Sequence, residues 1–219
     1  MIKRDHLNHI SFLYEPKLDY IKSFINKIEN INILEFGVMN GRSTKMFLEL
    51  CNKLNGKLIS VDINDHSNLF KNKNWKFIHS RDDDPKILKK LINKKFDIIY
   101  IDSLHEPNHI KKIFYMYYKF LKVGGRVFLD DINWLPYVKN SFKDSEYSEV
   151  INRKIFSKIL EIYYANLENM KLEFSFCGTG NANFLKLNDN NLKDTQKIKN
   201  RIFGLRNFAR IFLKRKPKM

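Results

Sequence analysis

The chain has 219 residues, of which 43% are hydrophobic and 29% charged. This is typical of one globular domain with a sizeable core. The sequence contains no apolar run long enough to predict a transmembrane helix. Residues 1–6 lack the apolar run of a secretory signal. Cys51 and Cys177 do not form a close-spaced pair, so neither a disulfide framework nor a zinc site is indicated. We therefore expect a cytoplasmic protein.

The formal net charge of +16 raises the question of a nucleic-acid or membrane partner. The excess is uneven, because residues 197–219 hold nine lysines and arginines and no acid. More than half of the excess therefore lies in this tail. The charge of the remaining chain is mild and does not by itself favour a nucleic-acid partner.

Helical and strand-like patterns alternate along the chain, which predicts βαβ units and a mainly parallel sheet. The predicted strands cover residues 31–36, 57–62, 75–79, 96–102, 126–131, 171–176 and 182–187. The predicted helices cover residues 16–30, a segment starting near 43, and residues 85–93, 107–121 and 147–169. We expect one domain over residues 1–190, with a helical lead-in over 1–30 and a loop over 132–150.

Ligands of an open parallel sheet bind beyond the carboxyl ends of its strands. The first strand is followed there by Gly37 and Gly41, which allow a tight turn and the close approach of a ligand. The spacing differs from the Gly-x-Gly-x-x-Gly of a dinucleotide site, and Glu35 would repel a pyrophosphate. A carboxylate there suits a zwitterionic amino acid or a sulfonium. The simpler alternative is a tight turn without a ligand.

Acids also follow the next two strands. Asp62 ends the second strand, where a carboxylate can accept hydrogen bonds from both hydroxyls of a ribose. After the third strand, Asp82 or Asp83 could reach the amino group of an adenine. Asp84 precedes Pro85 and is expected to cap the next helix. A lone acid is often only a cap, but the glycine turn beside Asp62 favours a nucleoside ligand.

Three acids follow the fourth and fifth strands, namely Asp102, Asp130 and Asp131. Crowded carboxylates are unfavourable unless they share a cation. Oxygen ligands without a thiolate favour Mg²⁺, Mn²⁺ or Ca²⁺ over zinc. His105 could enter the same pocket and accept a proton near neutral pH.

These residues also allow simpler roles. An Asp-Asp pair can cap the following segment, and a lone histidine is often a surface residue. His105 and His109 could instead form a metal pair on one helical turn, although Pro107 between them weakens that interpretation.

Four segments resemble the motifs of the class I S-adenosylmethionine (SAM)-dependent methyltransferases: ILEFGVMNGRS, ISVDIND, FDIIYIDSLHEPNHI and LKVGGRVFLDDI. Within that family the chain is most similar to the metal-dependent sugar O-methyltransferases of the macrocin and mycinamicin type. The likeness covers roughly residues 30–187. It implies an α/β fold with a Rossmann-like, doubly wound sheet of seven strands, in the order 3-2-1-4-5-7-6, whose last strand is antiparallel.

The resemblance also implies residue roles. The loop that holds the methionine part of SAM would comprise Glu35, Gly37, Gly41 and Ser43. Asp62 would bind the ribose, and Asp82 is the candidate for the adenine. The family commonly has Gly-Asp after the third strand where this chain has Ser80-Arg81, which leaves the adenine contact open.

The remaining roles concern the reaction. Asp102, Asp130 and Asp131 would bind a divalent cation, with Mg²⁺ the first choice, and His105 would be the general base. We expect methyl transfer from SAM to a hydroxyl of a small molecule or glycan, with a sugar favoured. The alternatives are a nucleic-acid methyltransferase and a non-catalytic scaffold of the same fold.

Two segments remain for the acceptor and for partners. In residues 132–150, Trp134, Tyr137 and Tyr147 would either cover the acceptor as a lid or pack the loop onto the core. Residues 191–219 form a tail that is predicted to be a basic amphipathic helix from Thr195 onward. Such a helix suits a membrane surface, a partner or a second subunit.

Overall fold

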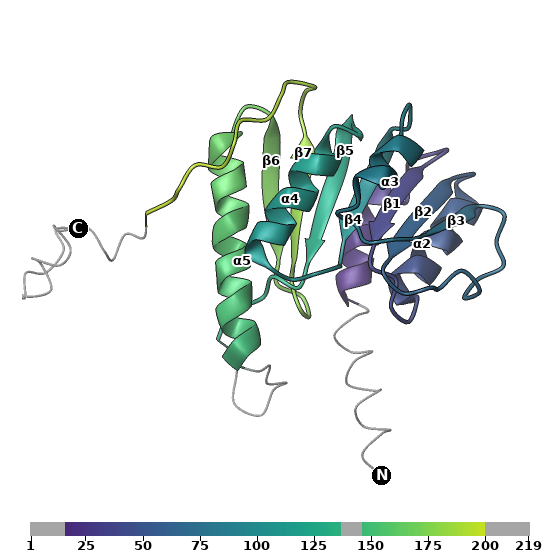
Figure 1. Ribbon diagram of the computed structural model, residues 1–219, viewed down its shortest axis with the longest axis horizontal. Helices are drawn as coiled ribbons and strands as arrows, with labels where there is room; N and C mark the ends of the chain where they lie inside the picture. The colour runs from purple at the N-terminus through teal and green to yellow at the C-terminus, as the bar shows by residue number, and fades with distance from the viewer. Residues whose placement is uncertain (1–15, 137–145, 200–219) are drawn as a thin grey trace, which may run out of the picture.

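A computed structural model of the protein describes residues 16–136 and 146–199. Its centre is a seven-stranded sheet in the order β3-β2-β1-β4-β5-β7-β6 (Figure 1). The strands are β1 (Asn32–Phe36), β2 (Lys57–Asp62), β3 (Trp75–His79), β4 (Phe96–Ile101), β5 (Leu121–Asp130), β6 (Met170–Ser175) and β7 (Asn181–Lys186). The strands from β1 to β5 pair in parallel, and β7 pairs antiparallel with both β5 and β6. The predicted strand order and the antiparallel last strand are therefore confirmed.

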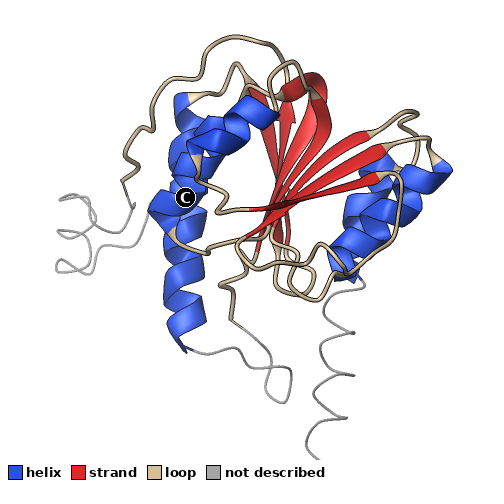
Figure 2. Ribbon diagram, turned by 45° about the vertical axis from the view of Figure 1, so that its right-hand side comes forward, coloured by secondary structure: helices blue, strands red, loops and turns tan. Residues whose placement is uncertain are grey.

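Helices cover both faces of the twisted sheet (Figure 2). They are α2 (Arg42–Lys53), α3 (Pro85–Lys90), α4 (Pro107–Tyr118) and α5 (Glu146–Ala165), preceded by an N-terminal helix over residues 16–25. Buried side chains of α3, α4 and α5 form one hydrophobic cluster with the sheet. The N-terminal helix and α2 form a second cluster with the sheet.

This layering explains the sequence of β4. All six of its residues are buried, because a parallel strand with helices on both faces has no solvent face. The start of α3 also follows its sequence. Asp84 accepts a hydrogen bond from the backbone N–H of Lys86 at 2.8 Å, and Pro85 begins the helix, so the predicted cap is confirmed.

The topology locates the ligand site. β1 pairs with β2 on one side and with β4 on the other, so the strand order reverses between β1 and β4. Side chains and loops at the carboxyl ends of these two strands border a crevice, which is where open α/β sheets bind ligands.

Several predicted boundaries differ from the structure, and two of them lie between α4 and β5. The helix predicted to reach residue 121 ends at Tyr118, and β5 begins at Leu121 rather than at residue 126. Leu121 pairs with Phe96 at the start of β4, and the backbone N–H of Phe96 donates to the carbonyl of Phe120 at 2.8 Å. Strand pairing thus begins before Gly124 and Gly125, and both glycines lie inside β5.

The C-terminal segment also differs in its described part. Residues 191–199 contain no helix. They lie along the domain, where Tyr115 donates to the carbonyl of Lys193 at 2.7 Å and Gln196 donates to the carbonyl of Glu161 at 3.3 Å. The tail helix predicted from Thr195 is therefore absent from residues 195–199, and residues 200–219 lie outside the described part. Within the described chain, no helix is long and apolar enough to cross a membrane.

Candidate active site

The loop after β1 packs directly against the end of β4. Gly37 adopts a φ of 93°, and a Cβ atom there would lie 1.9 Å from the carbonyl oxygen of Asp102. Only glycine allows this approach without strain. Gly41 is the N-cap of α2 with a φ of 76°, so both glycines have the turn role that the sequence indicates.

Asp62 ties this loop to the end of β2. Its Oδ2 accepts hydrogen bonds from the backbone N–H groups of Val38 at 2.7 Å and Met39 at 3.2 Å, and its Oδ1 accepts from Asn64 at 2.8 Å. Burial disfavours the carboxylate, but these three N–H groups outweigh it and hold the pKa of Asp62 below its ordinary value. Asp62 is therefore charged and fixed at the crevice.

Glu35 lies beneath the loop. It is fully buried, and its carboxyl group accepts hydrogen bonds from Ser43 at 2.7 Å, Thr44 at 2.8 Å and Ser60 at 2.6 Å. Burial raises the pKa of Glu35 to about 7, although the three hydroxyls oppose the shift. Glu35 supports the helix that follows the loop and does not line either hollow described below.

A hollow of about 410 Å³ lies beyond the ends of β1 to β4. Its lining includes Gly37, Asp62 and Asp82 together with the apolar side chains of Met39 and Ile63. The Oδ2 atom of Asp82 accepts from Ser103 at 2.5 Å and lies 2.8 Å from Nε2 of His109. Three of the predicted cofactor-binding residues thus face one hollow, with apolar surface beside them.

A second hollow of about 330 Å³ adjoins the first. The two share Gly37, Met39, Asp102 and Ser103 in their linings. The second is also lined by Ser43, His105 and Asp131. A ligand in the first hollow would therefore lie next to the acids that follow β4 and β5.

The acids and His105 form a compact group. Nε2 of His105 lies 3.4 Å from Oδ1 of Asp102 and 3.5 Å from Oδ2 of Asp131. Ligand atoms of these three side chains all lie within 4.8 Å of one another. Asp131 adopts a φ of 54°, a left-handed conformation that is uncommon outside glycine, asparagine and aspartate.

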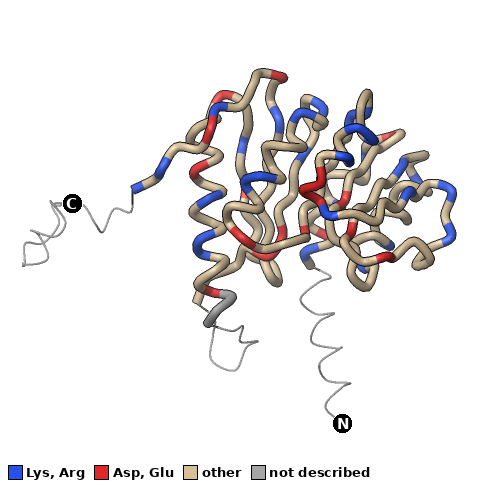
Figure 3. Tube along the Cα trace, viewed as in Figure 1, with Lys and Arg blue, Asp and Glu red and all other residues tan. Residues whose placement is uncertain are grey.

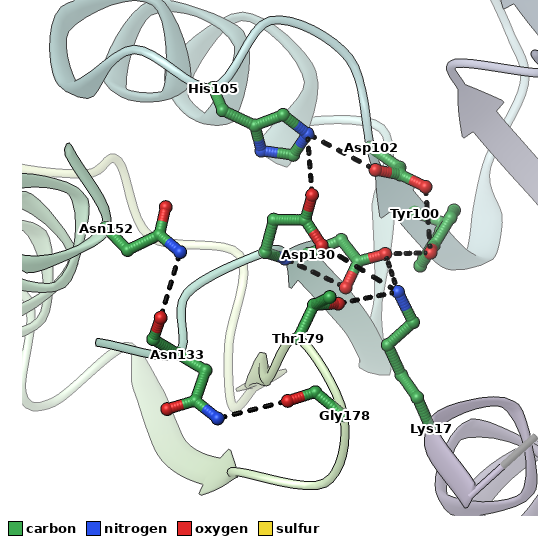
Figure 4. Close-up of polar contacts among 10 residues, drawn as sticks. Lys17, Tyr100, Asp102, His105, Asp130, Asn133, Asn152, Gly178 and Thr179 are labelled. Atoms are coloured by element: carbon green, nitrogen blue, oxygen red, sulfur yellow. Dashed lines mark hydrogen bonds and ion pairs between the residues drawn. The ribbon is translucent and has the colours of Figure 1, made fainter. Parts of the chain in front are cut away.

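Asp130 faces a different partner (Figure 4). Its Oδ2 accepts from Nζ of Lys17 at 2.5 Å and from the hydroxyl of Tyr100 at 2.5 Å. Its Oδ1 accepts from the backbone N–H of Asp131 at 2.8 Å. The sequence prediction grouped Asp130 with Asp102 and Asp131, whereas the structure groups His105 with those two acids. Asp130 is the last residue of β5, whereas Asp131 follows the strand in a left-handed conformation, so the two side chains take different directions.

The charges in this group shift its titrations. Burial and then the charge of Asp130 raise the pKa of Asp102. Burial would lower the pKa of His105, but its contact with Asp102 and the charges of Asp131 and Asp102 outweigh that effect and raise it to about 9. Burial would also lower the pKa of Lys17, but the nearby carboxylates raise it above its ordinary value. In the absence of any bound cation, the protein's own basic groups thus balance the acids.

Residues 34–132 match the sequence model of a family described as a methyltransferase domain. This range contains every residue of the two hollows named above. Residues 34–132 thus form a methyltransferase domain, and the sheet has the strand order of the class I SAM-dependent methyltransferase fold. No protein of curated function matches its sequence significantly.

Solved structures share the fold of this methyltransferase. MycE, a methyltransferase from the mycinamycin biosynthetic pathway solved with Mg and SAH, is 16% identical with a TM-score of 0.60, over 80% of this chain and 50% of that chain. A candidate caffeoyl-CoA O-methyltransferase from Staphylococcus aureus is 20% identical with a TM-score of 0.60, over 78% and 83%. SAH-bound PaMTH1 from Podospora anserina is 14% identical with a TM-score of 0.57, over 72% of each chain. The methyltransferase spans about half the length of MycE, and at these identities the likeness is one of fold.

The group formed by Asp102, His105 and Asp131 fits a divalent cation on the structure's own evidence. Within the described residues, Oδ1 of Asp131 and Nδ1 of His105 are buried without a hydrogen bond. Buried polar atoms normally have partners. The carboxylates of Asp102 and Asp131 suit Mg²⁺ or Mn²⁺ better than a thiolate-seeking metal. The methyltransferase could therefore hold such an ion here.

Asp83 and His109, which the sequence offered as alternative site residues, both form contacts with other side chains. Asp83 pairs with Arg81 at 2.9 Å and with Lys112 at 2.8 Å, and only Asp82 lines the first hollow. His109 contacts Asp82, as described above, so the alternative His105–His109 pair is not formed.

Trp134 is the described aromatic of the predicted lid. Its ring lies 5.7 Å from that of Phe156 in α5, and the guanidinium of Arg153 lies 5.3 Å from its centre. Trp134 thus packs its loop onto the domain. Tyr137 and the side chain of Tyr147 lie outside the described residues, so the lid itself remains a prediction.

Sequence reasoning did not find Lys17 or Tyr100. Tyr100 lies in the apolar strand β4, and nothing in the sequence of that strand indicates that its hydroxyl contacts an acid. Lys17 did leave a signal, because Lys17, Ile21 and Ile25 recur every four residues and the two isoleucines are fully buried. A lysine in register with a buried helix face needs an acidic partner.

Proposed function

We propose that this methyltransferase transfers the methyl group of SAM to a hydroxyl of a small molecule or glycan, with a sugar favoured as acceptor. A divalent cation, with Mg²⁺ as the first choice, would assist the reaction. The observation that carries the proposal is the adjacency of the two hollows. The first hollow, which would bind the methyl donor SAM, is lined by Asp62 and Asp82. The second hollow is lined by His105 beside Asp102 and Asp131.

The chain's own residues suit each step of binding. Gly37 leaves its backbone accessible to a ligand, and Asp62 stands at the end of β2, where an acid can bind a ribose. Asp82 stands further along the same hollow, where an adenine would follow the ribose. These positions favour one orientation of SAM, with its methyl group toward Asp102 and the second hollow.

His105 would act as the general base. Its Nε2 faces both Asp102 and Asp131. A cation held by these two acids would offset the charges that raise the pKa of the imidazole, so that the neutral ring could accept the proton of the attacking hydroxyl. Asp102 and Asp131 would hold the cation, whose chemistry would be to orient neighbouring hydroxyls and to lower their pKa. Much of the rate would come from placing donor and acceptor side by side. The MycE structure with Mg and SAH supports the pairing of this fold with a cation.

The experiment is a transfer assay with methyl-labelled SAM and a panel of glycosides, sugar nucleotides and catechols. The proposal expects label on the hydroxyl of a sugar, with Mg²⁺ present and not with excess EDTA. Label in tRNA or rRNA alone would contradict it and favour a nucleic-acid methyltransferase. Lysines and arginines are distributed along the whole described chain (Figure 3).

A further inference from the structure

Lys17 brings a positive charge into the acid cluster from outside the methyltransferase motifs. Its side chain is 1% exposed. Ile21 and Ile25, on the next two turns of the same helix, are fully buried against the sheet. The packing of the helix thus fixes the position of the ammonium group, unlike that of a flexible surface lysine.

Lys17 pairs with a buried carboxylate whose two oxygens both accept hydrogen bonds. Nζ donates to Oδ2 of Asp130 at 2.5 Å and to Oγ1 of Thr179 at 3.1 Å, and Tyr100 donates to the same Asp130 oxygen. The other oxygen of Asp130 accepts from a backbone N–H. Asp130 is fully buried, so each of its oxygens already has partners without a bound ion.

The same ammonium also stands close to the group that would bind a cation. Nζ of Lys17 lies 3.9 Å from Oδ1 of Asp131, which is too long for a hydrogen bond but well within the range of charge interactions. A divalent cation between Asp102 and Asp131 would therefore meet a fixed positive charge as its neighbour.

We propose that Lys17 is a tethered cation of the acid cluster, which removes Asp130 from the ligands of a divalent ion and leaves Asp102 and Asp131 to bind one. The proposal deepens the proposed function and rests on its cation site. Cation affinity depends on how many anionic ligands the site offers. Lys17 thus weakens the binding of the ion, both by occupying a carboxylate and by repulsion.

The test is a titration of the full chain with Mn²⁺, followed by the electron paramagnetic resonance signal of the free ion, without SAM or acceptor. Lys17→Met should bind Mn²⁺ about tenfold more tightly or better, because a carboxylate is released and a repulsive charge is lost. Lys17→Arg keeps the charge and should stay within about threefold of the unmodified protein. Lys122→Met is the matched control, since Lys122 pairs with Asp97 at 2.8 Å at the opposite end of the strands.

The double variant Lys17→Met with Asp130→Asn makes the test specific. It removes both charges of the pair, so Mn²⁺ affinity should return to within about threefold of the unmodified protein. If Lys17→Met does not fold, Lys17→Gln replaces it, because its amide can still donate to Asp130 and Thr179. Unchanged or weaker Mn²⁺ binding in a folded, uncharged Lys17 variant would overturn the proposal, as would loss of binding in the double variant.

Failure of this proposal and failure of the proposed function give different results. Tighter Mn²⁺ binding by Lys17→Met in a protein that methylates no hydroxyl would support the role of Lys17 and contradict O-methyl transfer. Cation-dependent sugar methylation with no effect of Lys17→Met on Mn²⁺ affinity would support the proposed function and overturn the role of Lys17.

Discussion

Asp62 ends β2 and Asp131 follows β5, and the two acids border adjoining hollows, but their surroundings are opposite. Asp62 accepts three backbone hydrogen bonds, and its pKa is lowered. Asp131 has one buried oxygen without a hydrogen bond among the described residues, and burial and the charge of Asp130 raise its pKa. The side of the first hollow (the donor side) is thus complete in the protein alone, whereas the side of the second hollow (the acid side) has a carboxylate oxygen that a bound cation could still contact. We expect the two sides to respond differently to mutation.

The largest effect is expected where the two sides meet. Gly37→Ala places a Cβ atom against the carbonyl of Asp102 in a left-handed conformation, so it should lower the free energy of unfolding by about 3 kcal/mol or more. Thermal unfolding and SAH binding measure the effect on the fold and on both hollows. Gly124→Ala is the matched control, because Gly124 also has a positive φ but meets nothing within 4 Å. Equal losses in both variants would show that the contact between the sides is unimportant.

His105→Ala should separate the reaction from donor binding. Loss of a general base lowers turnover by about 100-fold or more, while SAH affinity should remain unchanged because His105 lines only the second hollow. The measurements are methyl transfer and calorimetric SAH binding, with added imidazole to restore part of the activity. Full turnover in His105→Ala would exclude the base role.

Asp102→Asn should weaken the binding of a cation. It removes one of two carboxylates of the cation group, so Mn²⁺ affinity should fall by about tenfold. The substitution should also change the pKa of His105, because the negative charge of Asp102 raises the pKa of the imidazole. Loss of that charge should lower the His105 pKa from about 9 in the cation-free protein, as seen by NMR titration. A rise would contradict the described electrostatics.

A separate effect, on stability and not on ligand binding, is expected beneath the loop that follows β1. Burial raises the pKa of Glu35 to about 7 from its ordinary value of 4.5, so between these pH values the folded protein binds more protons at this site than the unfolded chain does. The contribution of Glu35 to stability therefore falls as pH rises from about 4.5 to 7, by up to about 3 kcal/mol. Glu35→Gln should flatten this dependence in denaturant unfolding, while Glu49→Gln, at an exposed position of α2, should not. An unchanged slope in Glu35→Gln would contradict the raised pKa.

The comparison between Asp62 and the acids at the end of β5 also explains what the sequence could predict. The sheet order, the glycine turn and Asp62 follow from local patterns and from the motif resemblance, because each depends on residues adjacent along the chain. The partner of Asp130 could not be predicted in this way. Lys17 is 113 residues away, and its approach depends on how the N-terminal helix packs on the sheet.

The start of β5 and the surroundings of Glu35 could not be predicted for a related reason. The sequence predicts a helix to residue 121 and a strand only from residue 126, but pairing with β4 extends the strand to Leu121. Glu35 matched a cofactor-binding motif, but three hydroxyls from α2 and β2 enclose its carboxyl group. In both cases contacts between elements decided the outcome.

The most direct test of this account is a calorimetric titration of the full chain with SAH, first with excess EDTA and then with Mg²⁺. A donor side that is complete in the protein alone should bind SAH with similar micromolar affinity in both conditions, and Asp62→Ala should abolish that binding. SAH binding that requires Mg²⁺, or no binding in either condition, would contradict this account. It would show that the donor side is not complete in the protein alone.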